Sequence, residues 1–535
     1  MKNHRQPSVM KHAFSQVPKA EIPRSSFDRS HGYKTTFNAG ELIPFFVDEA
    51  LPGDTFNLRA TGFSRMATPI FPIMDNLFMD TQFFAVPIRL IWDNWQKFNG
   101  EQNKPGDSTD YTIPQCFPPG GTGWVEGSIG DYFGLPTKVG GYSASALFFR
   151  AYNLIWNEWY RDENLQDPVE VHTDDGPDPA GVYSILRRGK RHDYFTSCLP
   201  WPQKGPGVTI PLGGYAPVIG NNQNSFVLGG AGTGVPNPLF ADSGGAIKAS
   251  VDPGNLRWSL DPSQTGNNTG LIADLSAATA ATINSLRQAF QIQKIYERDA
   301  RGGTRYTEIL KAHFGVTSPD ARLQRPEFLG GGSTPVQIAP VAQTSGTSGS
   351  GGYTPTPQGN LAAIGTSLFT GHGFNHSFTE HCVVIGIVSV RADLTYQQGL
   401  NRMWSRKTRF DYYWPALAHI GEQAVLNKEI FMKGVPVDDD AVFGYQERYA
   451  EYRYKPSQIT GLFRSNATGT LDSWHLSQHF LTAPVLNDQF ITENPPVDRV
   501  IATPDEPQFL FDGYLSYRCA RPMPVFGVPG YIDHF

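Results

Sequence analysis

Potential metal ligands gather at one point of the sequence, in the segment HGFNHSFTEH. They are His372, His376, Glu380 and His381. Two histidines four residues apart would share one face of a helix and could bind zinc there. Gly371 and Gly373 disfavour such a helix, and an apolar segment typical of a strand begins at residue 380. We therefore expect a loop that enters a core strand, and we predict no metal site.

Two acidic stretches carry carboxylates of the kind that hard cations such as Ca²⁺ prefer. The first contains Asp167, Glu170, Asp174, Asp175 and Asp178, and the second is Asp438 to Asp440. Because carboxylates in polar loops are usually solvated, we expect loop charge here in preference to a cation site.

Motifs for nucleotide binding and nucleophilic catalysis are missing from the sequence. No Lys-Ser or Lys-Thr follows a phosphate-binding glycine loop, and no Gly-x-Ser-x-Gly elbow lies between a strand and a helix. The segment GGAGTG at 229–234 lacks the strand-to-helix context of a dinucleotide site. We predict no catalytic residues and no cofactor, which favours a structural protein over an enzyme.

Four cysteines, Cys116, Cys198, Cys382 and Cys519, are far apart and form no Cys-x-x-Cys pair. This spacing predicts reduced thiols in a reducing compartment. The longest strongly apolar stretch, 382–390, is too short to span a membrane, and the first twenty residues lack the apolar core of a signal peptide. We expect a soluble protein that is not secreted.

Basic residues are concentrated at the N-terminus. Residues 1–34 contain seven Lys and Arg against two acidic residues, a net charge of +5, whereas the whole chain carries −6. Pro7, Pro18 and Pro23 and the lack of periodicity disfavour a helix. Such an arm is typical of proteins that contact nucleic acid, with a solvated tail as the alternative.

The elements that must position these residues are mainly strands. The chain has 535 residues, of which 55 are Gly and 42 are Pro, while 13% are aromatic and only 18% are charged. Long loops and short strands are typical of this composition, and low charge with many aromatic residues favours burial against other subunits. Predicted strands lie at 42–47, 55–61, 77–92, 380–394 and 511–522, with an extended or short helical piece at 446–456. The continuous apolar character of 77–92 predicts that both of its faces are covered.

Helices are predicted at 143–164 and 282–300 from their apolar spacing. In the first, the stripe of Leu147, Ala151, Leu154 and Ile155 predicts core packing, with Arg150 and Asn153 placed elsewhere. Two Gly-rich regions interrupt the pattern. Residues 206–280 resemble an insertion with short hairpins, and residues 330–359 are the best linker candidate. Strands at both ends of the chain then require a Greek-key closure, which an antiparallel jelly-roll sandwich satisfies.

Several segments in conserved order resemble the major capsid protein of the gokushovirus branch of the Microviridae, small phages with circular single-stranded DNA. They include FNAGELIPFFVDEALPGDTF at 37–56, FMDTQFFAVPIRLIWDNWQKFNGE at 78–101, FRAYNLIWNEWYRDENLQ at 149–166 and TSCLPWPQKG at 196–205. Further matches are AFQIQKIYERDARGGTRYTEILKAHFGV at 289–316, RPEFLGG at 325–331, RFDYYWPALAHIGEQAVLNKEIF at 409–431 and RCARPMPVFG at 518–527. The resemblance therefore extends over nearly the whole chain.

The resemblance implies an eight-stranded antiparallel jelly roll with long loop and helix insertions and no enzymatic activity. It implies a T=1 icosahedral shell of about sixty copies, assembled in the bacterial cytoplasm around circular single-stranded DNA. Expected partners are an internal scaffolding protein, minor capsid and DNA pilot proteins, and a host cell-surface receptor.

The resemblance also divides the chain into regions with expected roles. Residues 1–34 form an inner arm, 35–205 the first jelly-roll strands with helical insertions, 206–280 an outward three-fold protrusion, 281–330 a helical insertion, 331–360 a loop, and 361–535 the remaining strands and the C-terminal tail. DNA contacts are expected from Lys2, Arg5, Lys11, Lys19 and Arg24, with stacking by Phe14 and Phe27. The protrusion is expected to bury Phe226, Val227, Leu228, Leu239 and Phe240 between copies and to govern host attachment. The alternative from the residues alone is a secreted carbohydrate-active or carbohydrate-binding β-sandwich, suggested by the 10 Trp and 22 Tyr.

Overall fold

The computed structural model describes residues 23–120, 122–204, 283–317, 324–348 and 355–526, together with short strands between 218 and 273. The chain divides into two units, one made of 1–202 with 299–535 and the other of 203–298. The described residues contain no helix with the length and apolar character that a membrane span requires.

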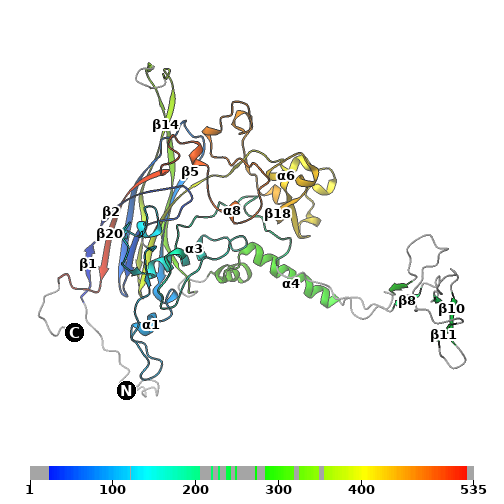
Figure 1. Cartoon of the computed structure of the whole chain (residues 1–535), viewed down its shortest axis with the longest axis horizontal. Coiled ribbons are helices and arrows are strands. Elements are labelled where there is room, and N and C mark those ends of the chain that lie inside the picture. The colour runs from blue at the N-terminus through cyan, green and yellow to red at the C-terminus, as the bar shows by residue number, and fades with distance from the viewer. Residues whose placement is uncertain are drawn as a thin grey trace, which may run out of the picture. The chain divides into compact units, whose positions relative to one another are not determined.

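The first unit is built on eight long antiparallel strands in its described part, curled into a half-barrel (Figure 1). One layer has the order β2 (His31–Phe37), β20 (Phe509–Arg521), β4 (Thr55–Met66), β14 (Leu361–Ser377). The other has the order β13 (Glu327–Ala342), β5 (Leu77–Pro87), β15 (Cys382–Ala392), β3 (Ile43–Ala50). The hairpin of β13 and β14 joins the layers, and β1 (Ser25–Asp28) also pairs with β20.

The order of the strands is that of a jelly roll. Each of four successive couples of strands along the chain contributes one strand to each layer: β2 and β3, β4 and β5, β13 and β14, and β15 and β20. This arrangement closes a double Greek key, so the last long strand pairs with the first. The predicted fold class, mainly β and jelly-roll, is confirmed.

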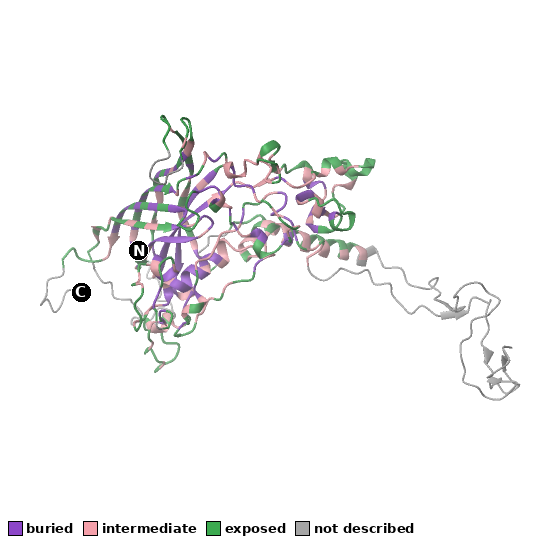
Figure 2. Cartoon of the chain, turned by 45° about the horizontal axis from the view of Figure 1, so that its top comes forward, coloured by how far each residue is buried: buried purple, intermediate pink, exposed green. Residues whose placement is uncertain are grey.

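The core between the layers explains the different sequence patterns of their strands. In β4 and β20 every second residue is buried, as in the register of Phe56 opposite Cys519 and Leu58 opposite Tyr517. The other faces of these two strands are largely exposed in the subunit (Figure 2). Alternation therefore marks a layer with one covered face.

Strands β5 and β15 are instead buried on both faces, as the sequence predicted for 77–92. Phe83 packs in the core between the layers, whereas Phe84 packs in a second apolar cluster on the other face. That cluster is supplied by α3 (Leu147–Trp159), whose Phe149 and Ile155 are fully buried. The predicted core helix at 143–164 is confirmed.

A third apolar cluster was not predicted from the sequence. It brings Tyr194, Phe195 and Cys198 against residues from 425–490, among them Phe443 and Phe490. The residues from 425–490 lie in the long connection between β15 and β20, for which the sequence predicted only an extended or short helical piece at 446–456. The connection contains β17 (Glu422–Leu426), α6 (Asn427–Ile430), α7 (Pro436–Asp439), β18 (Val442–Glu447) and α8 (Asp488–Ile491), with β16 (Thr395–Tyr396) paired to β19 (Ser457–Gln458).

Shorter elements complete the first unit. They are α1 (Trp95–Phe98), α2 (Ile129–Tyr132), α5 (Tyr306–Ile309), β6 (Gln115–Cys116) and β7 (Ala144–Ser145). The predicted helix at 282–300 is present as α4 (Ile283–Gly302), which begins in the second unit and ends in the first.

The second unit contains short paired strands, which agrees with the hairpins predicted for 206–280. One group is β9 (Val227–Leu228), β10 (Asn237–Ala241) and β11 (Ile247–Ala249), and the other is β8 (Val218–Gly220) with β12 (Leu271–Ala273).

Two sequence boundaries are corrected. The predicted linker at 330–359 begins inside β13, because its glycines belong to a strand that crosses β5 closely: a Cβ on Gly331 would overlap the Thr81 carbonyl oxygen. The predicted arm at 1–34 also includes β1 and most of β2, which are hydrogen-bonded to β20.

Candidate functional site

The predicted DNA-binding residues lie mostly outside the described part of the chain. Lys2, Arg5, Lys11, Phe14 and Lys19 fall there. The two that are described lie at the edge of the first layer: Arg24 donates a hydrogen bond to the Thr55 hydroxyl, and Phe27 lies opposite Cys519 in the β1–β20 pair. Both are anchored to the sheet, so a free basic arm could extend only over the residues that precede them.

The predicted protrusion residues lie in the second unit. Val227 and Leu228 form β9, and Leu239 and Phe240 belong to β10, which pairs with it. Phe226 lies outside the described residues. The pairing brings these backbones together within one copy, and contact with other copies stays a prediction.

The histidine cluster is divided between the sheet and a loop: Glu380 and His381 lie in the short turn that enters the core strand β15, as predicted, whereas the first two histidines lie in a strand. His372 and His376 lie on β14, where the Nδ1 of His372 is 2.8 Å from the Thr81 hydroxyl and its ring stacks on Phe369 at 4.5 Å between centroids. Burial lowers the pKa of His372. The described residues bring no three metal-ligating side chains together, and His372 serves as a bridge between strands.

The first acidic stretch is solvated loop charge only in part, because two of its carboxylates hold the fold. Asp178 is fully buried and binds Arg150 of α3 through two hydrogen bonds of 2.7 and 2.6 Å. Asp175 accepts a hydrogen bond of 2.7 Å from the indole nitrogen of Trp92. The helical spacing of the sequence predicted that Arg150 lies away from the core, but its side chain is completely buried. The expectation of loop charge is therefore wrong for the buried Asp178, whereas Asp167, Glu170 and Asp174 are exposed as expected.

The second acidic stretch is partly structural as well. Asp439 is buried and accepts hydrogen bonds of 2.8 Å from the backbone nitrogens of Lys433 and Gly434. Its neighbours are surface carboxylates, with Asp438 2.7 Å from Lys433 and Asp440 2.5 Å from Lys428. The three carboxylates therefore bind α7 and the residues after it to the neighbouring backbone and lysines.

A second buried ionic centre connects β5 and β15 to the chain that follows α3. The carboxylate of Asp80 on β5 lies 2.7 Å from Arg188 and 3.0 Å from Arg391 on β15. Burial alone would raise the pKa of Asp80, but the hydrogen bond from Ser333 and the two guanidinium groups outweigh it and lower the pKa. The sequence carried no local sign of this centre, since its members are separated by up to 311 residues.

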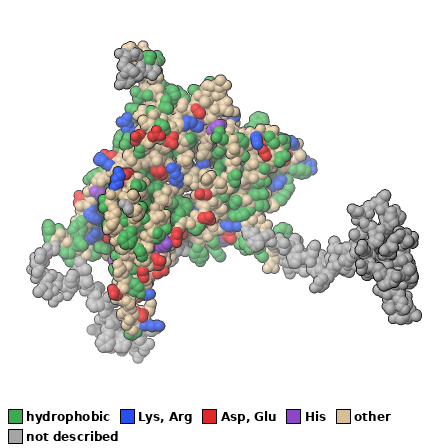
Figure 3. Space-filling view, in the orientation of Figure 1, with side chains coloured by type: hydrophobic (Ala, Val, Ile, Leu, Met, Phe, Trp, Pro, Cys, Tyr) green, Lys and Arg blue, Asp and Glu red, His purple; other side chains and the backbone are tan. Residues whose placement is uncertain are grey.

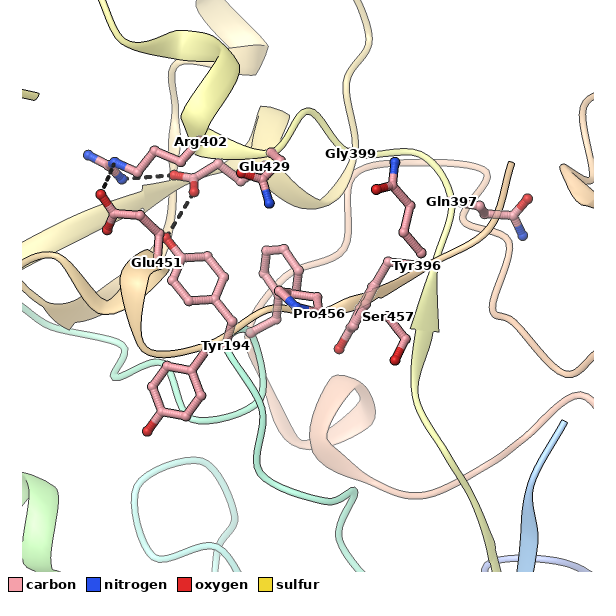
Figure 4. Close-up of a pocket in the computed structure, with 13 residues that line it drawn as sticks. Tyr194, Tyr396, Gln397, Gly399, Arg402, Glu429, Glu451, Pro456 and Ser457 are labelled. Carbon is pink, nitrogen blue, oxygen red and sulfur yellow. Dashed lines mark hydrogen bonds and ion pairs between the residues drawn. The ribbon is translucent and has the colours of Figure 1, made fainter. Parts of the chain in front are cut away.

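A small pocket opens beside the third apolar cluster (Figure 4). Glu429 lies in its wall and accepts hydrogen bonds from Tyr194 at 2.9 Å, Arg402 at 2.9 Å and the backbone nitrogen of Leu426 at 3.0 Å. Burial raises the pKa of Glu429. Arg402 also approaches Glu451 at 4.0 Å. Because these charged groups are occupied with one another, the pocket has the chemistry of a structural ion cluster and lacks a paired nucleophile and base.

The surface next to this pocket is rich in exposed aromatic rings. The segment 402–414, RMWSRKTRFDYYW, leaves Trp404, Phe410, Tyr412, Tyr413 and Trp414 between 47% and 72% exposed. Hydrophobic and basic side chains both cover the region of α6 and β18 on the face seen in Figure 3. In the sequence, the alternation of aromatic and basic residues was the available signal for this surface.

Comparison with known proteins decides the class. A model of the family described as "Capsid protein (F protein)" matches residues 15–531. The chain belongs to this capsid protein family. It is 49% identical to capsid protein VP1 of Bdellovibrio phage phiMH2K over 536 residues, with 98% of each chain covered.

Two further relatives carry the same name. Identity is 48% over 596 residues with capsid protein VP1 of Chlamydia phage 1, covering 99% of each chain, and 38% over 548 residues with that of Spiroplasma virus 4, covering 97% of each. The resemblance to gokushovirus capsid proteins is confirmed. The capsid protein is a structural component of the phage virion and not an enzyme, so the carbohydrate-active alternative is set aside.

Proposed function

We propose that the capsid protein assembles into a T=1 icosahedral shell of about sixty copies that encloses circular single-stranded DNA. The observation that carries the proposal is the amount of apolar surface on the single subunit. Leu481 is 87% exposed, Val437 83%, Phe314 72% and Val485 69%. A lone soluble subunit rarely exposes such side chains in number, and burial between copies removes them from water.

Electron microscopy of particles recovered from infected cells tests assembly. The expected result is a closed shell whose icosahedral reconstruction places one jelly roll per asymmetric unit, with nuclease-resistant single-stranded DNA inside. Subunits that stay monomeric throughout infection would contradict the proposal. An internal scaffolding protein, minor capsid and DNA pilot proteins remain predicted partners, testable by the composition of assembly intermediates and particles.

For the Gly-rich segment 206–280, we propose the role of an outward three-fold protrusion that attaches to a host receptor. Its support is architectural: the chain divides into two units, and the unit of 203–298 that contains this segment is distinct from the unit that carries the jelly-roll strands. A surface segment that the core does not need is free to vary for recognition.

Replacing residues 212–275 with a short Gly-Ser linker tests this role. Shell formation should be unchanged while adsorption to host cells falls. A truncated protein that no longer assembles would place the segment in the shell, and one that assembles and infects normally would remove the attachment role.

A further inference from the structure

One surface of the capsid protein combines unpaired cations with exposed aromatic rings. Lys407, Arg409 and Arg448 have no carboxylate within 4.0 Å among the described residues. Other cations nearby are paired, as Arg406 is with Glu451 at 3.5 Å. The charge of the three unpaired residues is therefore available to a ligand. We call this region, residues 402–414 with Arg448 and Tyr449, the aromatic–basic surface.

A hollow, which we call the basic pocket, lies in the same surface. It is lined by Arg402, Ser405, Arg406, Phe410, Asp411, Gln423, Leu426, Lys428, Glu429, Arg448 and Tyr449. Three of its polar atoms, Ser405 Oγ, Arg406 Nε and Arg448 Nε, are buried and have no hydrogen-bond partner in the described structure. Buried donors of this kind are costly unless a ligand or water satisfies them.

The carboxylates in the pocket wall do not supply the missing partners. Asp411 accepts hydrogen bonds of 2.8 and 2.7 Å from the backbone nitrogens of Lys407 and Thr408, which fix the loop. Glu429 is bound to Arg402, Tyr194 and the Leu426 backbone, as described above. An incoming anion would therefore meet unsatisfied N–H groups and an unpaired guanidinium.

The aromatic rings around the pocket are held in place while remaining exposed. Tyr413 packs edge-on against Tyr449 at 5.3 Å, and the indole nitrogen of Trp414 donates to the carbonyl of Arg409 at 2.8 Å. The guanidinium of Arg409 lies 4.7 Å from the ring centre of Phe410. Rings fixed by their neighbours lose little conformational freedom when a flat ligand stacks on them.

We propose that the aromatic–basic surface binds single-stranded nucleic acid. A phosphate occupies the basic pocket near Ser405 and Arg448, and unpaired bases stack on exposed rings such as Phe410 and Tyr412. Anion-binding donors beside sequence-tolerant stacking faces are the combination that unpaired strands require. This inference rests on the proposed enclosure of single-stranded DNA and adds a binding surface apart from the N-terminal arm.

Ultraviolet cross-linking of intact particles, followed by mass spectrometry of nuclease-treated peptides, tests the site. Nucleotide adducts are expected on residues 404–414. A variant with Lys407→Gln, Arg409→Gln and Arg448→Gln should lower the adduct yield several-fold and should leave shell formation unchanged. Lys138→Gln is the matched control, because Lys138 is an exposed cation already paired with Glu126 and lies outside the surface. Its adduct yield should equal that of the unmodified protein.

The outcomes distinguish failure of the proposed binding surface from failure of the proposed enclosure of DNA. DNA-filled particles without adducts on 404–414 would contradict nucleic-acid binding by the aromatic–basic surface, but would leave the proposed enclosure of DNA intact. If the unmodified particles lack these adducts and the triple variant forms no shell, the surface is a contact between copies. That result would overturn the inference. Particles that never contain DNA would overturn both.

Discussion

Arg150 on α3 and Asp178 form a buried two-point ion pair, with Nε and Nη2 at 2.7 and 2.6 Å from the two carboxylate oxygens. Arg150 also donates to the backbone carbonyls of Ile91 at 3.0 Å and Asp174 at 2.8 Å. One side chain thereby fastens the covering helix to the end of the strand layer and to the acidic loop. The charge of Arg150 is tolerable in the interior only because all of these acceptors converge on it.

Replacing Asp178 with Asn should lower the free energy of unfolding of the subunit by about 3–5 kcal/mol, because it leaves a buried guanidinium without its counter-charge. Denaturant unfolding of purified subunits measures the effect. Asp174→Asn is the matched control, since Asp174 contacts the same arginine at 3.3 Å but its side chain is 74% exposed, and it should change stability by less than about 1 kcal/mol. Equal losses in the two variants would contradict a dominant buried pair.

Asp80 should make stability depend on pH in the acidic range. Its pKa is lowered in the folded protein, so its ion pairs stabilise the fold above about pH 4, the ordinary Asp range, and this contribution is lost as the pH falls through the lowered value. Asp80→Asn should therefore unfold more easily than the unmodified protein at neutral pH, and the difference should shrink on acidification. A difference that is constant with pH would count against the mechanism.

The thiols of the capsid protein should resist modification in the native state. All four cysteines are buried and free, and burial raises the pKa of Cys116 and of Cys382 to about 12. Since the thiolate is the reactive form, labelling with a thiol reagent at neutral pH should be slow until the protein unfolds. Non-reducing electrophoresis of fresh particles should show monomer bands, and a disulfide-linked ladder would contradict the prediction.

Two truncations should separate the arm from the sheet. Deleting residues 2–22 removes only residues that precede β1, so subunits should still assemble, with less DNA in each particle if the arm binds it. Extending the deletion through Phe37 removes β2, whose Phe37 ring is buried and stacks on Phe509 at 5.8 Å. This longer deletion should abolish the folded subunit, as judged by solubility and protease resistance. Normal packaging by the shorter variant would exclude the arm from DNA binding.

Local sequence determined five of the eight long strands in the described part of the chain, β3, β4, β5, β15 and β20, and the helices α3 and α4, whereas β2, β13 and β14 were not predicted from it. The continuous apolar residues of 77–92 predicted a strand covered on both faces, and Phe83 and Phe84 do pack in different clusters. The apolar stripe of 147–155 predicted the helix that covers it. These features could be predicted because the periodicity of apolar residues depends on neighbours in the chain. The jelly-roll class was predicted from the resemblance of ordered segments to the capsid protein family.

Tertiary structure alone decided the ionic centres and the strands with unusual composition. Arg150 was assigned to a polar face and Asp178 to a solvated loop, and only folding places each opposite the other. The glycines at 330–332 suggested a linker, yet they lie in β13 because the neighbouring backbones leave no room for side chains. Asp80 meets Arg391 across 311 residues of sequence. Sequence propensity reflects the free-energy cost of a local backbone conformation. The ionic centres and the glycine-rich strand depend instead on partners that meet only when the two layers pack together.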